Sequence, residues 1–349
     1  SLFVPDAKGT SPARAGRGWS LGQVCFDTML AAYLVHPDQR SHKLDDVLSR
    51  LLGVTIEEEA GDSDALFDLG EIGEGPTAAQ VRAGSLAAAL HPLTDKPRRA
   101  LDESGETALL ADMEMPLARL LAQMETIGIA ADTRVLDDLS AELGADVDAA
   151  RQGAWSAAGR EVNLSSPKQL QEILFDHFAL PKTKKTKTGY TTNADALADL
   201  WAKTEASGGA GHDFLGFLLT HRDRNKLKQM VDSLSATVAT DGRIHTTFSQ
   251  VAAATGRLAS SDPNLQNIPA RSADGMRIRG AFVPGVGFES LMSADYSQIE
   301  MRLMAHLSGD EALIEAFNSG EDLHRTMASM VFGTPVAEVS SDERSRIKA

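Results

Sequence analysis

The residues best suited to chemistry surround Asp295. This aspartate closes an apolar run, residues 291–294, and lies just before a predicted helix. A divalent cation that assists phosphoryl transfer needs a rigid, hard oxygen ligand with room beside it for substrate phosphates. The carboxylate of Asp295 and the main-chain carbonyl of Tyr296 supply two such oxygens. An aspartate between a strand and a helix also serves as an ordinary helix cap, so the residues alone leave both interpretations open.

A second polar segment, residues 255–269, combines one arginine with several planar amides. Such side chains can reach minor-groove acceptors, sugars and phosphates of a nucleic acid. The residues concerned are Arg257, Asn264, Gln266 and Asn267. A turn cluster explains part of this composition but not the grouping. Downstream, Arg277 and Arg279 alternate with apolar residues, which predicts that both face one side of an extended segment.

Two basic clusters interrupt an otherwise acidic sequence. Residues 182–187 contain four lysines interleaved with threonines. Ammonium groups displace the counterions condensed on a polyanion, and hydroxyls donate to phosphate oxygens. A solubilising surface loop is the alternative for this tract. Further along, Arg224 and Lys228 lie four residues apart and share a helix face, and the two clusters together favour a polyanionic ligand.

The overall charge conceals these clusters. The 349 residues carry a formal net charge of −15, which as a single figure argues against a nucleic-acid partner. By region, residues 1–150 carry −14 and residues 151–300 carry +2, so the acidity is local. The single cysteine, Cys25, excludes an internal disulfide and a multi-cysteine metal site, which fits a reducing cytosol. The sequence contains no apolar run long enough to span a membrane.

Apolar periodicity predicts the elements that must position these residues. Helices are predicted at 26–34, 44–52, 109–127, 132–157, 167–178, 299–307, 311–317 and 323–332. A last helix begins at Ser340, which forms a capping box with Glu343. Strand-like alternation predicts strands at 242–248 and 288–295. Because the sequence starts without methionine and stops inside a predicted helix, we expect a fragment of a longer chain.

Two of these motifs resemble a known family. Residues 295–300 resemble the first catalytic motif of family A DNA polymerases, and residues 255–269 resemble their template–primer-binding segment. The resemblance continues through residues 114–117 and 163–170 and covers nearly the whole sequence. It implies a mixed α+β fold with an exonuclease-like α/β remnant, a helical thumb, an antiparallel-sheet palm and the first part of helical fingers. The implied divisions are 1–108 (partial, degenerate 3′–5′ exonuclease-like domain), 109–240 (thumb with a palm-proximal helix), 241–309 (palm with the first catalytic motif) and 310–349 (start of the fingers).

The resemblance also implies roles for individual residues. Asp295 and the Tyr296 carbonyl would bind two Mg²⁺ ions, for which Mn²⁺ can substitute, and Glu300 would exclude a ribose 2′-hydroxyl. The implied catalytic residues are therefore Asp295, Tyr296 and Glu300. The implied dNTP-binding residues are Gln298, Ile299, Glu300, His324, Arg344 and Lys348. The implied DNA-binding residues are Arg257, Asn264, Gln266, Asn267, Asn163, Ser165, Lys168, Lys182, Lys184, Lys185 and Lys187. On their own, Arg344 and Lys348 would be an ordinary solvated helix face.

Two features of the family pattern are missing. The second carboxylate motif of the family, a His-Asp-Glu turn, does not follow Asp295, and His212-Asp213-Phe214 stands too early in the sequence to replace it. Residues 82–90 contain neither the tyrosine nor the aspartate of the last exonuclease motif. We therefore expect no proofreading, and no DNA synthesis by this fragment alone.

The expected function is template-directed transfer of dNTPs to a primer 3′-hydroxyl, in DNA repair and replication. The expected partners are primer–template DNA and dNTPs, without a membrane, and the expected protein is a cytoplasmic, nucleoid-associated monomer. Two alternatives stay open. One is a non-catalytic DNA-binding fragment, and the other is a single-subunit RNA polymerase, which the carboxylate of Glu300 disfavours.

Overall fold

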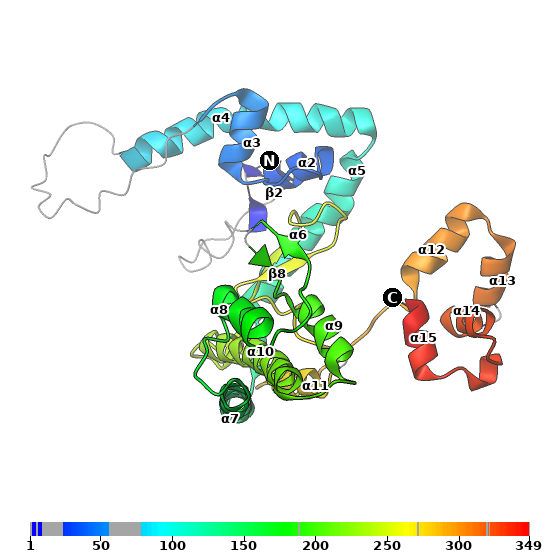
Figure 1. The fold of residues 1–349 in the computed structure, drawn as a ribbon. Coiled ribbons are helices and arrows are strands. Elements are labelled where there is room, and N and C mark those ends of the chain that lie inside the picture. Colours follow the sequence, from blue (N-terminus) through cyan, green and yellow to red (C-terminus); the bar gives the residue numbers. More distant parts are fainter. Residues whose placement is uncertain are drawn as a thin grey trace, which may run out of the picture. The chain divides into compact units, whose positions relative to one another are not determined.

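The computed structural model describes two units, Ser1–Ser290 and Leu291–Ala349. The described residues are 2–4, 6–8, 24–55, 78–187, 189–270, 272–318, 320 and 322–348. Helices predominate in both units, and small sheets lie among them (Figure 1). The predicted mixed α+β fold is thereby confirmed, while the division into four domains stays a prediction. Within the described residues, no helix is both long and apolar enough to cross a bilayer.

The first elements form a small α/β layer. Strand β1 (Leu2–Val4) pairs in parallel with β2 (Val24–Asp27), which leads directly into helix α2 (Thr28–Val35). Helix α3 (Leu44–Leu52) has the predicted bounds, whereas the helix predicted from residue 26 begins only at Thr28 because its first residues belong to β2. The long helix α4 (Ala78–Ser104) packs on α2 and α3 and includes residues 82–90.

A glycine turns the chain from helix to sheet. The helix predicted at 109–127 comprises α5 (Thr107–Leu109), a π-helical turn η1 (Leu110–Glu114) and α6 (Met115–Ile127). Gly128 ends it with a φ of 63°, and a Cβ there would lie 2.8 Å from the His245 ring and from the carbonyl oxygen of Ile244. Only glycine fits both the backbone conformation and this close approach, so α6 can pass directly into β3 (Ile129–Ala131).

Strand β3 is the centre of a three-stranded antiparallel sheet. Its partners are β6 (Arg243–Ile244) and β9 (Phe282–Val283). The strand predicted at 242–248 is split between two sheets, and His245 and Thr246, whose side chains bond to the carbonyl of Glu125 and to Ser260, lie between the two pieces. The chain then resumes as β7 (Thr247–Ser249), which pairs antiparallel with β8 (Ala259–Ser261).

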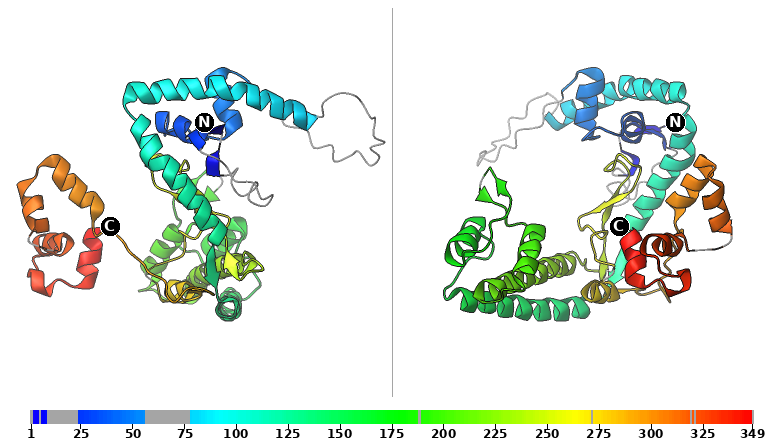
Figure 2. Two further views of the ribbon diagram at one scale, coloured as in Figure 1. Left: turned by 180° about the vertical axis from the view of Figure 1, so that it is seen from behind. Right: turned by 45° about the vertical axis from the view of Figure 1, so that its right-hand side comes forward.

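Two long antiparallel helices join most of the first unit. Helix α7 (Thr133–Ala158) begins at its cap Asp132, and α10 (Ala210–Ala236) runs beside it (Figure 2). At one end Leu139, Val231 and the sheet residue Ile244 share a core. At the other end α7 and α10 pack with α8 (Pro167–Gln171), its π-helical continuation η2 (Glu172–His177) and α9 (Ala194–Thr204). The helices predicted at 132–157 and 167–178 are confirmed.

The prediction of an extended segment carrying Arg277 and Arg279 is wrong. These arginines lie on helix α11 (Ala273–Gly280), which Ser272 caps by accepting a hydrogen bond from the Gly275 N–H at 3.1 Å. The local alternation of apolar and basic residues was compatible with a strand. Burial of Ile278 against α7 and the sheet, together with the serine cap, decides for a helix.

The second unit is a set of short helices. They are α12 (Ile299–Ser308), α13 (Glu311–Asn318), α14 (Leu323–Phe332), a 3₁₀ turn η3 (Val336–Glu338) and α15 (Ser341–Lys348). The predicted helices and the capping box are confirmed, since Ser340 and Glu343 exchange hydrogen bonds. The strand predicted at 288–295 is wrong. A strand needs a partner for its backbone groups, no described segment pairs with these residues, and Met292 is 90% exposed.

Asp27 is a buried carboxylate that fastens the first layer. One oxygen accepts from the backbone N–H groups of Met29 and Leu30, and the other accepts from the N–H of Ala7 at 2.6 Å. Burial raises the pKa of Asp27 to about 7, although the N–H groups of Ala7 and Leu30 act in the opposite direction. The folded protein therefore binds a proton here at pH values where the unfolded chain has released it.

We predict that Asp27 makes the first layer less stable as pH rises. Below pH 3.8, the pKa of Asp27 in the unfolded chain, the proton contributes its full stabilisation. Above that pH the free energy of unfolding falls by roughly 1.4 kcal/mol per pH unit, and the contribution is lost once the pH exceeds about 7. Urea unfolding and hydrogen exchange of residues 24–35 at pH 5 and pH 8 measure the slope. Asp27→Asn should abolish it, whereas Asp38→Asn, at an exposed turn, should keep it. An unchanged slope in Asp27→Asn contradicts the assignment.

Candidate nucleic-acid and nucleotide site

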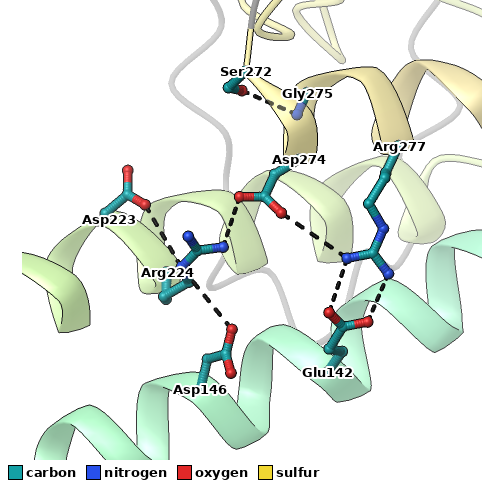
Figure 3. Close-up of polar contacts among 8 residues, drawn as sticks. All are labelled: Glu142, Asp146, Asp223, Arg224, Ser272, Asp274, Gly275 and Arg277. Carbon is teal, nitrogen blue, oxygen red and sulfur yellow. Dashed lines mark hydrogen bonds and ion pairs between the residues drawn. The ribbon is translucent and has the colours of Figure 1, made fainter.

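Arg224 and Lys228, the two basic residues of α10 that share a face, are held in ion pairs within the protein. Arg224 pairs with Asp274 of α11 at 2.6 Å and lies about 4 Å from both Asp146 and Asp223 (Figure 3). Lys228, one turn later, pairs with Asp232 at 2.6 Å. These contacts neutralise the face that the sequence offered to a polyanion, so this cluster stabilises the packing of helices instead.

Arg277 completes the network. Its two terminal nitrogens bind both carboxylate oxygens of Glu142 on α7, at 2.8 and 2.6 Å (Figure 3). The bonds and charge of Arg277 hold the pKa of Glu142 below its usual value. Arg279 instead donates to the carbonyl oxygens of Pro269 and Ile268. Both arginines that the sequence placed on one surface therefore fix α11, one to α7 and the other to the end of the 255–269 segment.

The lysine tract forms the tip of a small hairpin. Strands β4 (Lys185–Thr186) and β5 (Gly189–Tyr190) pair antiparallel, and the ammonium group of Lys182 lies 5.1 Å from the centre of the Tyr190 ring. All four lysines are exposed. Among the described residues, no carboxylate pairs with Lys184, Lys185 or Lys187. This cluster, unlike that on α10, keeps its charge available to a ligand.

The 255–269 segment is ordered by its own side chains and still exposes its polar groups. The carboxamide oxygen of Asn264 accepts from the N–H groups of Gln266 and Asn267, and the Gln266 amide donates to the carbonyl of Leu258 at 3.0 Å. Ser260 is buried and binds Thr246, which fixes the loop on the sheet. The four predicted DNA-binding residues of this segment, Arg257, Asn264, Gln266 and Asn267, are all exposed.

The turn before α8 presents a further exposed polar group. The carboxamide oxygen of Asn163 accepts from the Ser165 N–H at 2.9 Å, and Ser166 caps α8. The side chains of Asn163, Ser165 and Lys168 are exposed on this turn and the helix that follows. Backbone-held turns of this kind suit phosphate contacts, because hydroxyl, amide and ammonium donors all point outward from a fixed main chain.

In the second unit, Asp295 and Tyr296 lie on an exposed segment without regular structure. Glu300 follows in the first turn of α12 and is also exposed. Hard oxygen donors of this kind suit Mg²⁺. Within the described residues, however, no three histidine, cysteine, aspartate or glutamate side chains gather as a potential metal site. The donor types of Asp295 and the Tyr296 carbonyl therefore fit the expected metal, and their role as its ligands stays a prediction.

Three of the predicted nucleotide-binding residues are connected. The Gln298 amide lies 2.5 Å from Nδ1 of His324, and that nitrogen is 4.0 Å from a carboxylate oxygen of Asp322. The other oxygen of Asp322 accepts from Nε of Arg344 on α15 at 2.7 Å. Ile299 begins α12 directly after Gln298. Lys348 is the last residue of α15, and its side chain lies outside the described residues.

Asp322 is the site residue that the sequence did not reveal. Burial acts to raise its pKa, but the hydrogen bond from Arg344, the N–H groups of Arg325 and His324 and the charge of Arg344 outweigh it, so the pKa lies below its usual value. In the sequence Asp322 is one more acidic residue before a predicted helix, which signals a cap. Its second partner is 22 residues away and has no local signature.

Comparison with known proteins gives one family. The family model described as DNA polymerase family A matches residues 133–349. DNA polymerase I of Mycobacterium tuberculosis is 51% identical over 345 residues, covering 99% of this chain and 37% of that protein. DNA polymerase I of Pseudomonas aeruginosa is 40% identical over 350 residues, covering 97% of this chain and 37% of that protein.

A solved structure agrees with these sequence matches. It is described as the POL domain of Pol1 from M. smegmatis in complex with DNA primer-template and dNTP, and its TM-score is 0.87 at 49% identity. The match covers 99% of this chain and 56% of the other. The chain thus spans little more than a third of the length of its curated relatives. Since the family model covers more than half of the sequence and the fold matches throughout, the chain belongs to DNA polymerase family A.

Proposed function

We propose that the protein containing this chain carries out template-directed DNA synthesis, adding dNTPs to a primer 3′-hydroxyl in DNA repair and replication. It acts in the cytoplasm, at the nucleoid, as a monomer on primer–template DNA and without a membrane partner. One observation carries the proposal. Gln298, three residues after Asp295, bonds to the His324 ring, and Asp322 bonds both to the backbone of His324 and to Arg344, so an imidazole and a guanidinium share one carboxylate partner, as a triphosphate-binding site requires of its cations.

Different residues of the chain bind different parts of the nucleotide and the DNA. Arg344 and His324 bind the triphosphate, and Glu300 lies against the sugar and opposes a 2′-hydroxyl. The exposed lysines of the β4–β5 hairpin bind the duplex backbone together with Asn163, Ser165 and Lys168. Arg257, Asn264, Gln266 and Asn267 bind the minor-groove side, whose acceptors are similar for all base pairs, so the enzyme tolerates every sequence.

Asp295 and the Tyr296 carbonyl would hold Mg²⁺, in a two-ion site for which Mn²⁺ can substitute. Bound metal would activate the primer 3′-hydroxyl and neutralise the charge that develops on the leaving pyrophosphate. A two-ion site needs another carboxylate, and the His-Asp-Glu motif that supplies it in the family does not follow Asp295 in this sequence. We therefore propose that the 349 residues alone bind primer–template weakly and do not extend it. Because residues 82–90 lack the tyrosine and aspartate of the exonuclease motif, we also propose that proofreading is absent.

Two alternatives make different predictions. A non-catalytic DNA-binding fragment is favoured by the incomplete metal-ligand set, and it would bind DNA without any synthesis in the full-length protein. A single-subunit RNA polymerase would use ribonucleotides, which the carboxylate of Glu300 opposes. Primer extension by the full-length protein with dNTPs or rNTPs separates all three.

We predict that Asp295→Ala abolishes primer extension by the full-length protein. Loss of a metal-binding carboxylate removes several kcal/mol of transition-state stabilisation, equivalent to about three orders of magnitude in rate. The rate of single-nucleotide addition measures it, with Glu289→Ala as a control that removes a nearby exposed carboxylate. Extension by Asp295→Ala at the wild-type rate would refute the catalytic assignment.

Glu300→Ala should relax the selection of the sugar. Removing the side chain opens space for a 2′-hydroxyl, so the ratio of kcat/KM for rNTP to that for dNTP should rise by roughly 10- to 200-fold. The control is Glu311→Ala, which removes an exposed carboxylate in the first turn of α13. If the ratio does not change, Glu300 has no role in sugar selection.

The two basic clusters should behave in opposite ways. The double variant Lys184→Ala, Lys185→Ala should release up to about two fewer counterions on binding DNA, because each phosphate contact releases roughly 0.9 counterion. Its free energy of unfolding should be unchanged. Arg224→Gln should leave the salt dependence unchanged and lower stability by about 1–3 kcal/mol, because Asp274 loses its closest partner. DNA binding titrated against salt and urea unfolding measure both effects. The reverse pattern would show that the α10 cluster is the DNA contact.

A further inference from the structure

The two carboxylate oxygens of Asp322 accept hydrogen bonds from two different helices. Oδ1 accepts from the N–H groups of His324 and Arg325 at 3.2 and 3.3 Å and thereby caps α14. Oδ2 accepts from Nε of Arg344 at 2.7 Å. One side chain therefore sets both where α14 begins and where the guanidinium of α15 points.

The contact with Nε has a directional consequence. A guanidinium has five N–H donors in one plane, and a phosphate can bind with two hydrogen bonds across the edge formed by Nη1 and Nη2. Because Asp322 bonds to Nε, it does not occupy this edge. Within the described residues, neither Nη1 nor Nη2 has a hydrogen-bond or ion-pair partner. Arg344 is thus held by one charge while the donors that suit a second oxyanion are left available.

The same carboxylate also sets the position of His324. The capped first turn fixes the backbone of His324, and the Gln298 amide donates to its Nδ1, which leaves the ring proton on Nε2. His324 and Arg344 belong to different helices, and Asp322 contacts both. A change at Asp322 that spared the cap would therefore release Arg344 alone.

We infer that Asp322 is a positioning residue for the nucleotide: it orients the Nη edge of Arg344 toward the triphosphate and sets the affinity for dNTP without touching the reacting atoms. This inference rests on the proposed function. An alternative effect of Asp322 is competition, in which its negative charge repels the triphosphate. Side chains of Asp322 and Arg344 are 37% and 32% exposed, so water screens that repulsion, whereas the orientation of the guanidinium is not screened.

Asp322→Asn separates the two tasks. Asparagine is as good a helix cap as aspartate, so its oxygen can keep the bonds to His324 and Arg325. Its amide nitrogen then faces Nε–H of Arg344, and two donors cannot bond. Asp322→Ala loses both the cap and the ion pair. Asp342→Asn is the matched control, since it removes the same charge from α15 at an exposed site 4.0 Å from Arg346.

The test measures single-nucleotide addition by the full-length protein. Asp322→Asn should raise KM for dNTP about 3- to 10-fold, the cost of ordering one long side chain on binding, with kcat within twofold and an unchanged melting temperature. Asp322→Ala should raise KM similarly and also lower the melting temperature. Asp342→Asn should change neither. In an Arg344→Gln background, Asp322→Asn should have no further effect on KM, because it acts through Arg344.

The outcomes distinguish this inference from the proposed function. If the wild type extends primers and Asp295→Ala does not, the proposed function stands. An unchanged or lowered KM in Asp322→Asn, or an undiminished effect in the Arg344→Gln background, then overturns the positioning role alone. If the wild type adds no nucleotide, the proposed function fails. In that case, binding of tripolyphosphate, measured calorimetrically, still tests Asp322, because Asp322→Asn should weaken it by the same factor and equal binding would overturn the role.

Discussion

The antiparallel contact between α7 and α10 is the interaction on which most of the first unit depends. Ser235 and Asp232 of α10 bond to Asp137 and Ser140 near the start of α7. Each helix contributes apolar residues to two separate cores, one with the sheet and α11 and the other with α8, η2 and α9. The pair therefore fixes the distance between the 255–269 segment, which is anchored on the sheet, and the lysine hairpin, which is anchored on the opposite core.

The pairing of charged side chains follows the same packing of helices. Where α7, α10 and α11 meet, cations and carboxylates neutralise one another, as Arg224 and Arg277 do with Asp274 and Glu142. In the hairpin, by contrast, no carboxylate among the described residues pairs with Lys184, Lys185 or Lys187. Whether the cations of a basic stretch stay unpaired thus depends on which carboxylates lie within reach, and the net charge of the protein carries none of this information.

The sequence correctly predicted the elements that local periodicity and capping determine. It did not predict the contacts and strands that depend on partners far away in the sequence. The long helices, the cap of α8 and the Ser340–Glu343 capping box follow from residues within a few positions of one another. The partner of Arg277 is 135 residues away, and that of Arg344 is 22 residues away, so neither pairing leaves a local pattern. The strand predicted at 288–295 failed for the same reason. An apolar alternating segment becomes a strand only where another segment completes its hydrogen bonds.

The unequal pairing of charge along α7 gives the first unit an electrical polarity. The carboxylates that pair with α10 and α11, Glu142 and Asp146, lie near the middle of the 26-residue helix α7, whereas Tyr190 of the hairpin packs on the core that contains Ala154 and Ala158. Under the proposed function, a polyanion would therefore be attracted to the hairpin and not to the ion-paired middle of the helix pair.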